Sequence, residues 1–258
     1  METDEGVGLT ITGNILKNRT ERIIEEENKM KTIGLLGGMS WESTVTYYQV
    51  INETIKEKLG GLHSAKILLY SVDFDEIERC QSSGDWEKSA AILRDAAQHL
   101  EAAGADFIVI CTNTMHKVAE EIKAGLSVPL LHIAEATAQK LTEAGITRVG
   151  LLGTSYTMTE SFYKDVIREA GIDVLTPEGE AIRTVNSIIF DELCVGIIRE
   201  ESKQVLLRII QQLQNNGAQG VILGCTELGL IIHSEDLELP VFDTALIHAR
   251  EAALAALR

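Results

Sequence analysis

The chain has 258 residues, which is long enough for one large domain or for two smaller lobes. It carries 39 acidic and 23 basic side chains, so its formal net charge is −16. This balance argues against a protein that grips nucleic-acid phosphates or an anionic membrane surface, because both need clustered Lys and Arg. Hydrophobic residues at 45% and charged residues at 24% are typical of a soluble globular protein.

The four cysteines are widely separated, and their spacing indicates free thiols. None forms a C-x-x-C pair and none has a histidine at zinc-finger spacing, so we expect no structural metal. An 18-residue apolar run and a secretory signal are both absent from the sequence. We therefore expect a cytoplasmic protein with reduced thiols. The cysteines are Cys80, Cys111, Cys194 and Cys225.

The first 29 residues are predicted to be an acidic N-terminal extension. They are disordered or helical in this interpretation, with one short helix expected at 21–28. We expect no chemistry there.

From Met30 onward, short apolar runs alternate with helical periodicity, which is typical of βα units and a parallel sheet. Amphipathic helices such as 86–103 and 203–215 lie between the runs. The expected strands are 32–36, 65–72, 107–110, 128–132, 148–152, 173–175, 220–223 and 241–242.

The sequence repeats itself in three places, in the same order and with nearly the same spacing. We infer an α/β fold of two pseudo-symmetric lobes, each with a parallel-type sheet flanked by helices, and an active site in the cleft between them. The expected first lobe comprises 30–126 plus 239–258, and the expected second lobe 127–238. The matching segments are 33–38 with 149–154, 104–113 with 217–226, and 128–131 with 239–242.

Aligned repeats place Thr112 and Cys225 at equivalent strand ends, so the two lobes present one hydroxyl and one thiol. Polar residues follow each of them at an expected helix start. Backbone N–H groups at such a junction bind anions through unpaired donors and the helix dipole. The pattern therefore predicts a site for a small anionic ligand.

Four motifs at these positions resemble the aspartate/glutamate racemase family, within the Asp/Glu/hydantoin racemase superfamily. The resemblance covers about Met30 to Arg258 and is specific because all four motifs occur in order within a doubled chain. It implies cofactor-independent racemisation, a homodimer, and a last helix that returns to the first lobe. The motifs are Gly-Leu-Leu-Gly-Gly-Met-Ser-Trp-Glu-Ser43, Cys-Thr-Asn-Thr-Met-His116, Gly-Cys-Thr-Glu227 and Pro-Val-Phe-Asp-Thr244.

The family implies two catalytic cysteines, one on each side of the substrate Cα, and this sequence departs from that pattern at Thr112. A thiol has a pKa of about 8.5, lowered by helix N-termini, so we expect Cys225 to reach the thiolate form near neutral pH. A threonine hydroxyl has no accessible titration. The resemblance assigns the second-lobe cysteine to the L-enantiomer, so we expect Cys225 to deprotonate an L-amino acid and the D side to react slowly.

The expected substrate is aspartate or glutamate, and the expected binding residues lie around the repeated strand ends. Donors near the α-carboxylate would stabilise the developing carbanion. A glutamine, rather than a cation, in the segment after the second strand would also admit neutral polar amino acids. His116 and His248 are expected to be scaffolding, and Lys164 is expected to be a solvated charge on a helix. The expected substrate-binding set is Met39, Ser40, Gln81, Asn113, Thr114, Thr154, Glu192, Thr226 and Glu227.

Three alternatives remain open at this point. The first is a broad-specificity racemase of neutral polar amino acids. The second is a related decarboxylase that uses a single cysteine, which suits the missing first thiol. The third is a two-lobe binding protein that closes on a ligand without chemistry.

Overall fold

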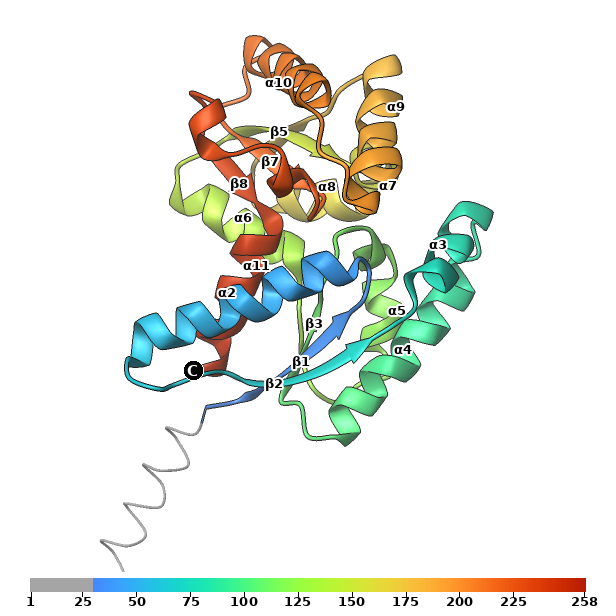
Figure 1. The fold of residues 1–258 in the computed structure, drawn as a ribbon, viewed down its shortest axis with the longest axis vertical. Helices are drawn as coiled ribbons and strands as arrows, with labels where there is room; N and C mark the ends of the chain where they lie inside the picture. Colours follow the sequence, from blue (N-terminus) through green and yellow to red (C-terminus); the bar gives the residue numbers. More distant parts are fainter. Residues whose placement is uncertain (1–29) are drawn as a thin grey trace, which may run out of the picture.

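Two four-stranded parallel sheets form the centres of two lobes, which lie one above the other in Figure 1. The computed structural model describes residues 30–258, so the extension at 1–29 and the helix expected at 21–28 lie outside the described residues. The first sheet contains β1 (Thr32–Gly37), β2 (Lys66–Ser71), β3 (Phe107–Ile110) and β4 (Leu130–Leu131). The second contains β5 (Arg148–Gly153), β6 (Asp173–Leu175), β7 (Val221–Gly224) and β8 (Val241–Asp243).

Helices cover both faces of each sheet. In the first lobe these are α2 (Trp41–Leu59), α3 (Phe74–Ser83), α4 (Trp86–Ala102), η1 (Thr114–Val118), α5 (Ala119–Lys123) and α11 (Thr244–Ala256). In the second they are α6 (Ile133–Glu143), α7 (Ser155–Thr159), α8 (Ser161–Glu169), α9 (Glu180–Ser187), η2 (Ile188–Glu192), η3 (Leu193–Val195), α10 (Glu200–Asn215), η4 (Leu228–Leu230) and η5 (Ser234–Asp236). Within residues 30–258, no helix is both long and apolar enough to cross a lipid bilayer.

The strand orders are β2-β1-β3-β4 and β6-β5-β7-β8, so each strand of one lobe has a counterpart in the other. This identity confirms the expected α/β fold of two matching lobes. The apolar runs form strands because alternate residues bury on opposite faces: Leu35 packs under α2 and α11, whereas Leu36 packs under α4. The carboxyl ends of β1, β3, β5 and β7 all carry residues of the expected site.

The strand pairing places both limits between the lobes at other residues than the sequence predicted. β4 pairs with β3 in the first sheet, and β8 pairs with β7 in the second. The expected limits at 126/127 and 238/239 were therefore wrong by one strand each, and the chain crosses between lobes after β4 and after β8. The carbonyls of Pro129 and Pro240, at the starts of these strands, accept hydrogen bonds from β3 and β7 and so tie each strand to the preceding sheet.

The last helix, α11, returns to the first lobe and packs against α2. Its contact face consists of alanines, including Ala249 and Ala252, which are completely buried against Tyr47 and Ile51. Small side chains allow the two helix backbones to approach closely, so α11 joins the last strand of one lobe to the core of the other.

Three histidines, of which His116 and His248 are buried and His132 is half-buried, lie where the chain crosses between the lobes. The ring of His116 is 4.5 Å from that of His132 and 5.8 Å from that of His248. Because a carbonyl only accepts, His116 Nδ1 donates to the Thr112 carbonyl (2.8 Å), and its Nε2 accepts from the Ile133 N–H (3.2 Å). His116 therefore links the end of β3 to the start of α6.

His248 makes the matching link at the second crossing. Its Nε2 donates to the Leu131 carbonyl (2.9 Å), and its Nδ1 accepts from the Tyr47 hydroxyl (2.8 Å). Burial lowers the pKa of His248 to about 3 and that of His132 to about 4, and it lowers the pKa of His116 as well. All three rings are therefore neutral near pH 7, which agrees with the expected scaffolding role of His116 and His248.

We expect the free energy of unfolding to fall as the pH drops below about 6.5, where unfolded histidines take up protons and the buried ones do not. Urea unfolding at pH 7.5, 6.5 and 5.5 measures this. His248→Gln removes one histidine that takes up a proton on unfolding. It should therefore reduce the slope of the free energy of unfolding against pH by up to about 1.4 kcal/mol per pH unit. The control, His63→Gln, removes an exposed imidazole and should keep the wild-type slope. An unchanged slope in His248→Gln would contradict this account.

Candidate active site

The site is assembled from two pairs of strand ends, one pair from each lobe. Ser40 follows β1 and caps the N-terminus of α2, and Thr154 follows β5 and caps the N-terminus of α7. The turn before Ser40 needs glycine, because Gly38 has φ +91° and any Cβ there would collide with the backbone of Val72. The sequence therefore brings a hydroxyl N-cap to the same place in each lobe.

Two hydrogen bonds between side chains connect these caps to the other lobe. Ser40 Oγ donates to Glu227 Oε1 (2.8 Å), and the hydroxyls of Thr114 and Thr154 lie 3.1 Å apart. In the aligned repeats, Thr114 and Glu227 occupy equivalent positions after Thr112 and Cys225. The two contacts are thus pseudo-symmetric, and each joins a residue two positions after Thr112 or Cys225 to the N-cap of the other lobe.

Glu227 is the most heavily bonded group of the site. Besides Ser40, its carboxylate accepts from the Cys225 thiol (2.9 Å) and from the Thr226 hydroxyl (2.7 Å) at Oε2. The Glu227 side chain is buried, and none of the ion pairs in the described part of the chain involves it. A buried carboxylate held only by neutral donors is a strong acceptor for the proton of an adjacent thiol.

The environment of Cys225 corrects one expectation. Burial, and secondarily the negative charge of Glu227, raise the pKa of the Cys225 thiol well above its ordinary value. The expected thiolate near neutral pH is therefore wrong for the ligand-free site, where Cys225 is a protonated thiol that donates to Glu227. The sequence showed a strand end and a polar helix start, and it did not show the carboxylate beside the sulfur.

On the first-lobe side, Thr112 and Asn113 are buried at the end of β3. Asn113 Nδ2 donates to Thr244 Oγ1 (2.9 Å), and that hydroxyl in turn donates to the Leu223 carbonyl (2.8 Å). The amide orientation is therefore fixed, and it leaves Asn113 Oδ1 buried without a partner in the structure. An unpaired buried acceptor beside the cleft suits a ligand N–H donor.

Gln81 borders a hollow of about 260 Å³ between the lobes. Its side chain donates to Met115 Sδ (2.9 Å), and its carbonyl accepts from the Tyr156 hydroxyl (3.1 Å). Sequence reasoning missed the second-lobe side of this hollow, although Tyr156 comes two residues after the Thr154 cap. The lining residues are Glu78, Gln81, Ser82, Ser155, Tyr156, Asn186 and Phe190.

Two expected binding residues have other partners. Glu192 accepts from Ser202 Oγ (2.6 Å) and pairs with Arg199 (3.4 Å), so its carboxylate is directed to α10. Met39 packs in the core of the first lobe, so only its backbone lies in the turn before α2. Lys164 is also bonded within its own lobe, because its ammonium donates to the carbonyls of Met158 and Thr159 at the end of α7.

The other three thiols differ from Cys225 in their surroundings, and only Cys194 lies close enough to Cys225 to affect its pKa. Cys80 and Cys111 are buried in the first lobe, and burial raises the pKa of Cys111. Burial, together with the charges of Glu227 and Glu42, raises the pKa of Cys194 to about 12. The described residues contain no cluster of His, Cys, Asp and Glu with the arrangement of a metal site.

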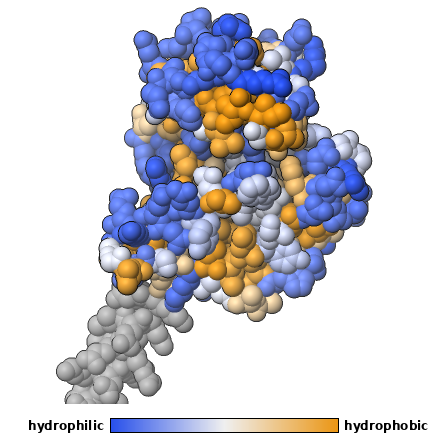
Figure 2. Space-filling view, in the orientation of Figure 1, coloured by the Kyte–Doolittle hydropathy of each residue, from blue (hydrophilic) through white to orange (hydrophobic). Residues whose placement is uncertain are grey.

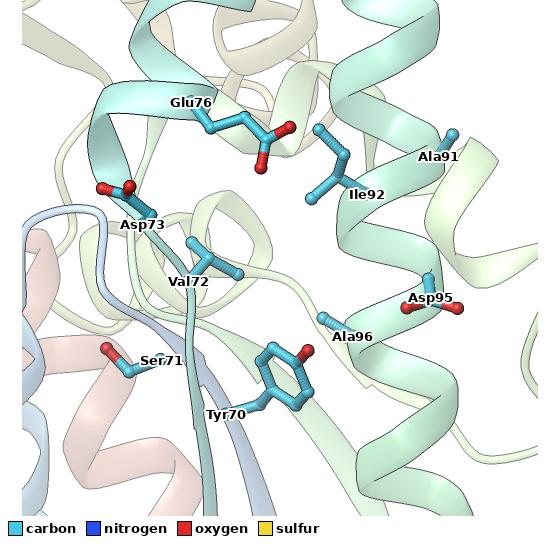
Figure 3. Close-up of a pocket in the computed structure, with 9 residues that line it drawn as sticks. All are labelled: Tyr70, Ser71, Val72, Asp73, Glu76, Ala91, Ile92, Asp95 and Ala96. Atoms are coloured by element: carbon cyan, nitrogen blue, oxygen red, sulfur yellow. The ribbon is translucent and has the colours of Figure 1, made fainter.

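A second hollow, of about 450 Å³, lies outside this cleft, between the end of β2 and helices α3 and α4 (Figure 3). Three carboxylates line it, and in Figure 3 that of Glu76 points toward the open space. It contains none of the expected site residues. The carboxylates that line it are those of Asp73, Glu76 and Asp95.

The fold and the cleft define a two-lobe α/β enzyme with a thiol and a hydroxyl on opposing strand ends. The family model for Asp/Glu/Hydantoin racemase matches residues 36–252, so the chain belongs to this family. It is identified as an isomerase, with the amino-acid racemase activity of that family.

Individual relatives agree with this assignment. The chain is 27% identical over 225 residues to the broad specificity amino-acid racemase RacX of Bacillus subtilis, covering 84% of this chain and 95% of that one. A structure from Yersinia pestis, provisionally described as an Asp/Glu racemase, is 53% identical with a TM-score of 0.83, covering 89% of this chain and 100% of that one. An aspartate racemase homologue from Pyrococcus horikoshii is 38% identical with a TM-score of 0.78, at the same coverage.

Replacing Glu227 by Gln should make the Cys225 thiol ionise at lower pH, because the neighbouring negative charge is removed. A buried neighbouring charge shifts a pKa by about one to three units. The measurement is the pH dependence of iodoacetamide alkylation, read at the Cys225 peptide by mass spectrometry. Glu42→Gln is the control, since Glu42 acts on Cys194 and not on Cys225. If alkylation of Cys225 in Glu227→Gln required the same pH as in the wild type, or a higher one, the contact between Cys225 and Glu227 would be refuted.

Proposed function

We propose that the protein racemises aspartate and glutamate without a cofactor, by Cα proton abstraction and reprotonation, and that it favours the L-enantiomer. The observation that carries this is the pairing across the cleft. Cys225 has a carboxylate, Glu227, in hydrogen-bond contact, whereas Thr112 is followed at the equivalent position by the neutral Thr114. On this proposal Thr112 stands where the family pattern has its first cysteine, and no carboxylate occupies the position equivalent to Glu227 beside it.

The proton path starts at the Cys225–Glu227 contact. Glu227 takes the thiol proton, which leaves a thiolate that removes the Cα proton of the bound amino acid. The electron pair of the broken C–H bond stays on the substrate as a carbanion conjugated with its carboxylate. Return of a proton to the opposite face then gives the other enantiomer. Thr112 donates that proton and regains one from water, and the hydroxide left behind is neutralised by the proton that Glu227 releases, so the site returns to its starting state. General acid–base steps of this kind contribute about 10²–10⁴ in rate.

The substrate backbone has matching partners in the cleft. Asn113 Oδ1, which is buried and unpaired, is assigned to the α-ammonium group. The hydroxyls of Ser40, Thr114 and Thr154 are assigned to the α-carboxylate, whose developing charge they stabilise. Binding there would displace the Ser40–Glu227 bond and leave Glu227 free to hold the thiol proton.

One observation favours a second candidate, a broad-specificity racemase of neutral polar amino acids. The hollow that Gln81 borders is the natural place for the substrate side chain, and its lining has hydrogen-bonding groups and one carboxylate but no cation. A distal carboxylate would rely there on the amides of Gln81 and Asn186. Comparing kcat/KM for L-Asp and L-Glu with that for L-Gln and L-Ser decides between the two substrate classes.

We also propose that the protein acts as a homodimer. The supporting observation is that three large apolar side chains on one side of α2 are more than half exposed: Trp41 at 64%, Val45 at 54% and Tyr48 at 55%.

Exchange of Cα protons in D₂O, followed by NMR, tests the chemistry. We expect L-glutamate or L-aspartate to exchange faster than it racemises, and the D-enantiomer to exchange more slowly. Cys225→Ala should lose about 10²–10⁴-fold in exchange rate, whereas Cys194→Ala, the control thiol, should retain it. Binding of the amino acid without exchange of its Cα proton would indicate a ligand-binding protein. Release of CO₂ from an arylmalonate would indicate a decarboxylase. Exchange at the wild-type rate in Cys225→Ala would reject the assignment of this thiol as the base.

Restoring the missing side of the site tests the L preference. Thr112→Cys should raise exchange of the D-enantiomer, because it supplies a thiol at the position equivalent to Cys225. The double change Thr112→Cys with Thr114→Glu should raise it further, because it adds the equivalent of Glu227. Thr114→Glu alone is the control and should give no gain. Equal wild-type rates from both enantiomers would overturn the one-sided account.

A further inference from the structure

The threonine that ends the Pro-Val-Phe-Asp-Thr244 motif lies between the two strand ends of the site. It is the first residue of α11, which begins where the chain leaves β8 and crosses to the first lobe. Figure 2 shows the outer surfaces of the two lobes meeting, and Thr244 lies beneath that surface because it is completely buried. Burying a hydroxyl costs free energy unless it is hydrogen-bonded, so the partners of this hydroxyl indicate its role.

The Thr244 hydroxyl joins a residue next to Thr112 to a residue near Cys225. It accepts from Asn113 Nδ2 (2.9 Å) and donates to the Leu223 carbonyl (2.8 Å). Asn113 directly follows Thr112, and Leu223 comes two residues before Cys225. One hydroxyl from α11 therefore connects the ends of β3 and β7, the two strands that carry the proposed catalytic residues.

The chemistry of this hydroxyl determines which end of the Asn113 amide faces it. A hydroxyl has one proton and a carbonyl oxygen can only accept, so the Thr244 proton is used in the bond to Leu223. The group of Asn113 that meets Thr244 must then be a donor, and only the NH₂ end of the amide is one. The other end, Oδ1, is the buried acceptor that has no partner among residues 30–258. Thr244 thus selects the orientation in which this oxygen is left for a ligand.

The start of α11 does not require the Thr244 hydroxyl. Asp243 caps this helix, because its Oδ1 accepts from the N–H groups of Ala245 and Leu246 (2.9 and 3.1 Å). Both hydrogen bonds of the Thr244 hydroxyl lead instead to the strands of the site.

The internal repeat has no counterpart of this connection. In the aligned repeats, Ile133 is equivalent to Thr244, and Thr226 is equivalent to Asn113. Ile133 begins α6 as Thr244 begins α11, but it has no hydroxyl. The two-lobe scaffold therefore forms the same strand-to-helix turn without such a bond, which occurs only on the Asn113 side of the site.

We propose that Thr244 is a positioning residue for the racemase reaction, because it holds the Asn113 amide with its oxygen toward the α-ammonium group of the substrate. The inference rests on the role given to Asn113 in the proposed function. Without the Thr244 hydroxyl, the amide is free to turn over and to present its NH₂ group to the ammonium, and two donors that face each other repel. A ligand that lacks the ammonium group should not be affected by this change.

Binding of two ligands to the full chain, measured by isothermal titration calorimetry, tests the proposal. L-Glutamate has the α-ammonium group, and glutarate is the same dicarboxylate without it. Thr244→Val keeps the shape of the side chain and removes the hydroxyl. We expect the affinity for L-glutamate to fall about 10–100-fold, as for loss of a hydrogen bond to a charged group, and the affinity for glutarate to stay the same. Thr244→Ser restores the hydroxyl and should restore the affinity for L-glutamate.

Thr137→Val is the matched control. Thr137 is also completely buried, and its hydroxyl donates to the Ile133 carbonyl (2.8 Å) and accepts from the Tyr163 hydroxyl (3.3 Å) in the core of the second lobe. This variant should leave the affinity for L-glutamate unchanged. Equal losses for both ligands in Thr244→Val, an unchanged affinity for L-glutamate in that variant, or a loss in Thr137→Val would overturn the proposal.

Asn113→Asp separates the orientation of this side chain from its presence. A carboxylate accepts at both oxygens, so turning it over changes nothing. Thr244→Val added to Asn113→Asp should therefore weaken L-glutamate binding much less than Thr244→Val alone does. An equal loss in both backgrounds would overturn the proposal, and this comparison decides the matter if glutarate fails to bind the wild type.

Exchange of the Cα proton distinguishes this inference from the proposed function. Thr244→Val should raise the KM for exchange of L-glutamate more than it lowers kcat, because the ammonium is held in the ground state and the transition state alike. A wild type that binds L-glutamate with this dependence on Thr244, but does not exchange its Cα proton, would reject the racemase proposal and leave the role of Thr244 standing. Exchange with the same KM in Thr244→Val and the wild type would do the reverse.

Discussion

One buried carboxylate connects the two lobes to the thiol of Cys225. Glu227 accepts a hydrogen bond from Ser40 of the first lobe and from Cys225 of the second. Burying a carboxylate is costly unless several donors surround it. Here Ser40, Cys225 and Thr226 are the donors, so closure of the lobes and the protonation state of the thiol depend on the same group.

The internal repeat explains why such a site forms at this place. Equivalent strands end at the cleft from both lobes, so any polar residue at those ends faces its counterpart. The repeat has diverged in chemistry: Cys225 and Glu227 occupy one side, and Thr112 and Thr114 the other. The buried histidines at the two chain crossings keep the scaffold fixed behind Thr112, since His116 is bonded to its carbonyl.

Much of the fold was predictable from the sequence, because apolar runs bounded by glycine leave few alternatives to buried parallel strands. The caps Ser40 and Thr154 were also predictable, since each follows a strand of the repeat. The directions in which the side chains point were not predictable. Glu192 and Glu227 are both acidic residues in the second lobe, yet one is bonded to α10 and the other to the thiol. Burial and, secondarily, that contact raise the pKa of the Cys225 thiol, and neither can be read from the spacing of residues along the chain.

The central claim is that Glu227 receives the thiol proton when Cys225 attacks the substrate. It is tested most directly by the kcat for Cα exchange of L-glutamate in Glu227→Gln, measured against pH beside the wild type. The account predicts a loss of about 10²–10⁴-fold near pH 7. It also predicts partial recovery as the pH rises toward the pKa of the Cys225 thiol, which removal of the neighbouring charge lowers, because solvent base then forms the thiolate. Wild-type exchange in Glu227→Gln at neutral pH would contradict the account.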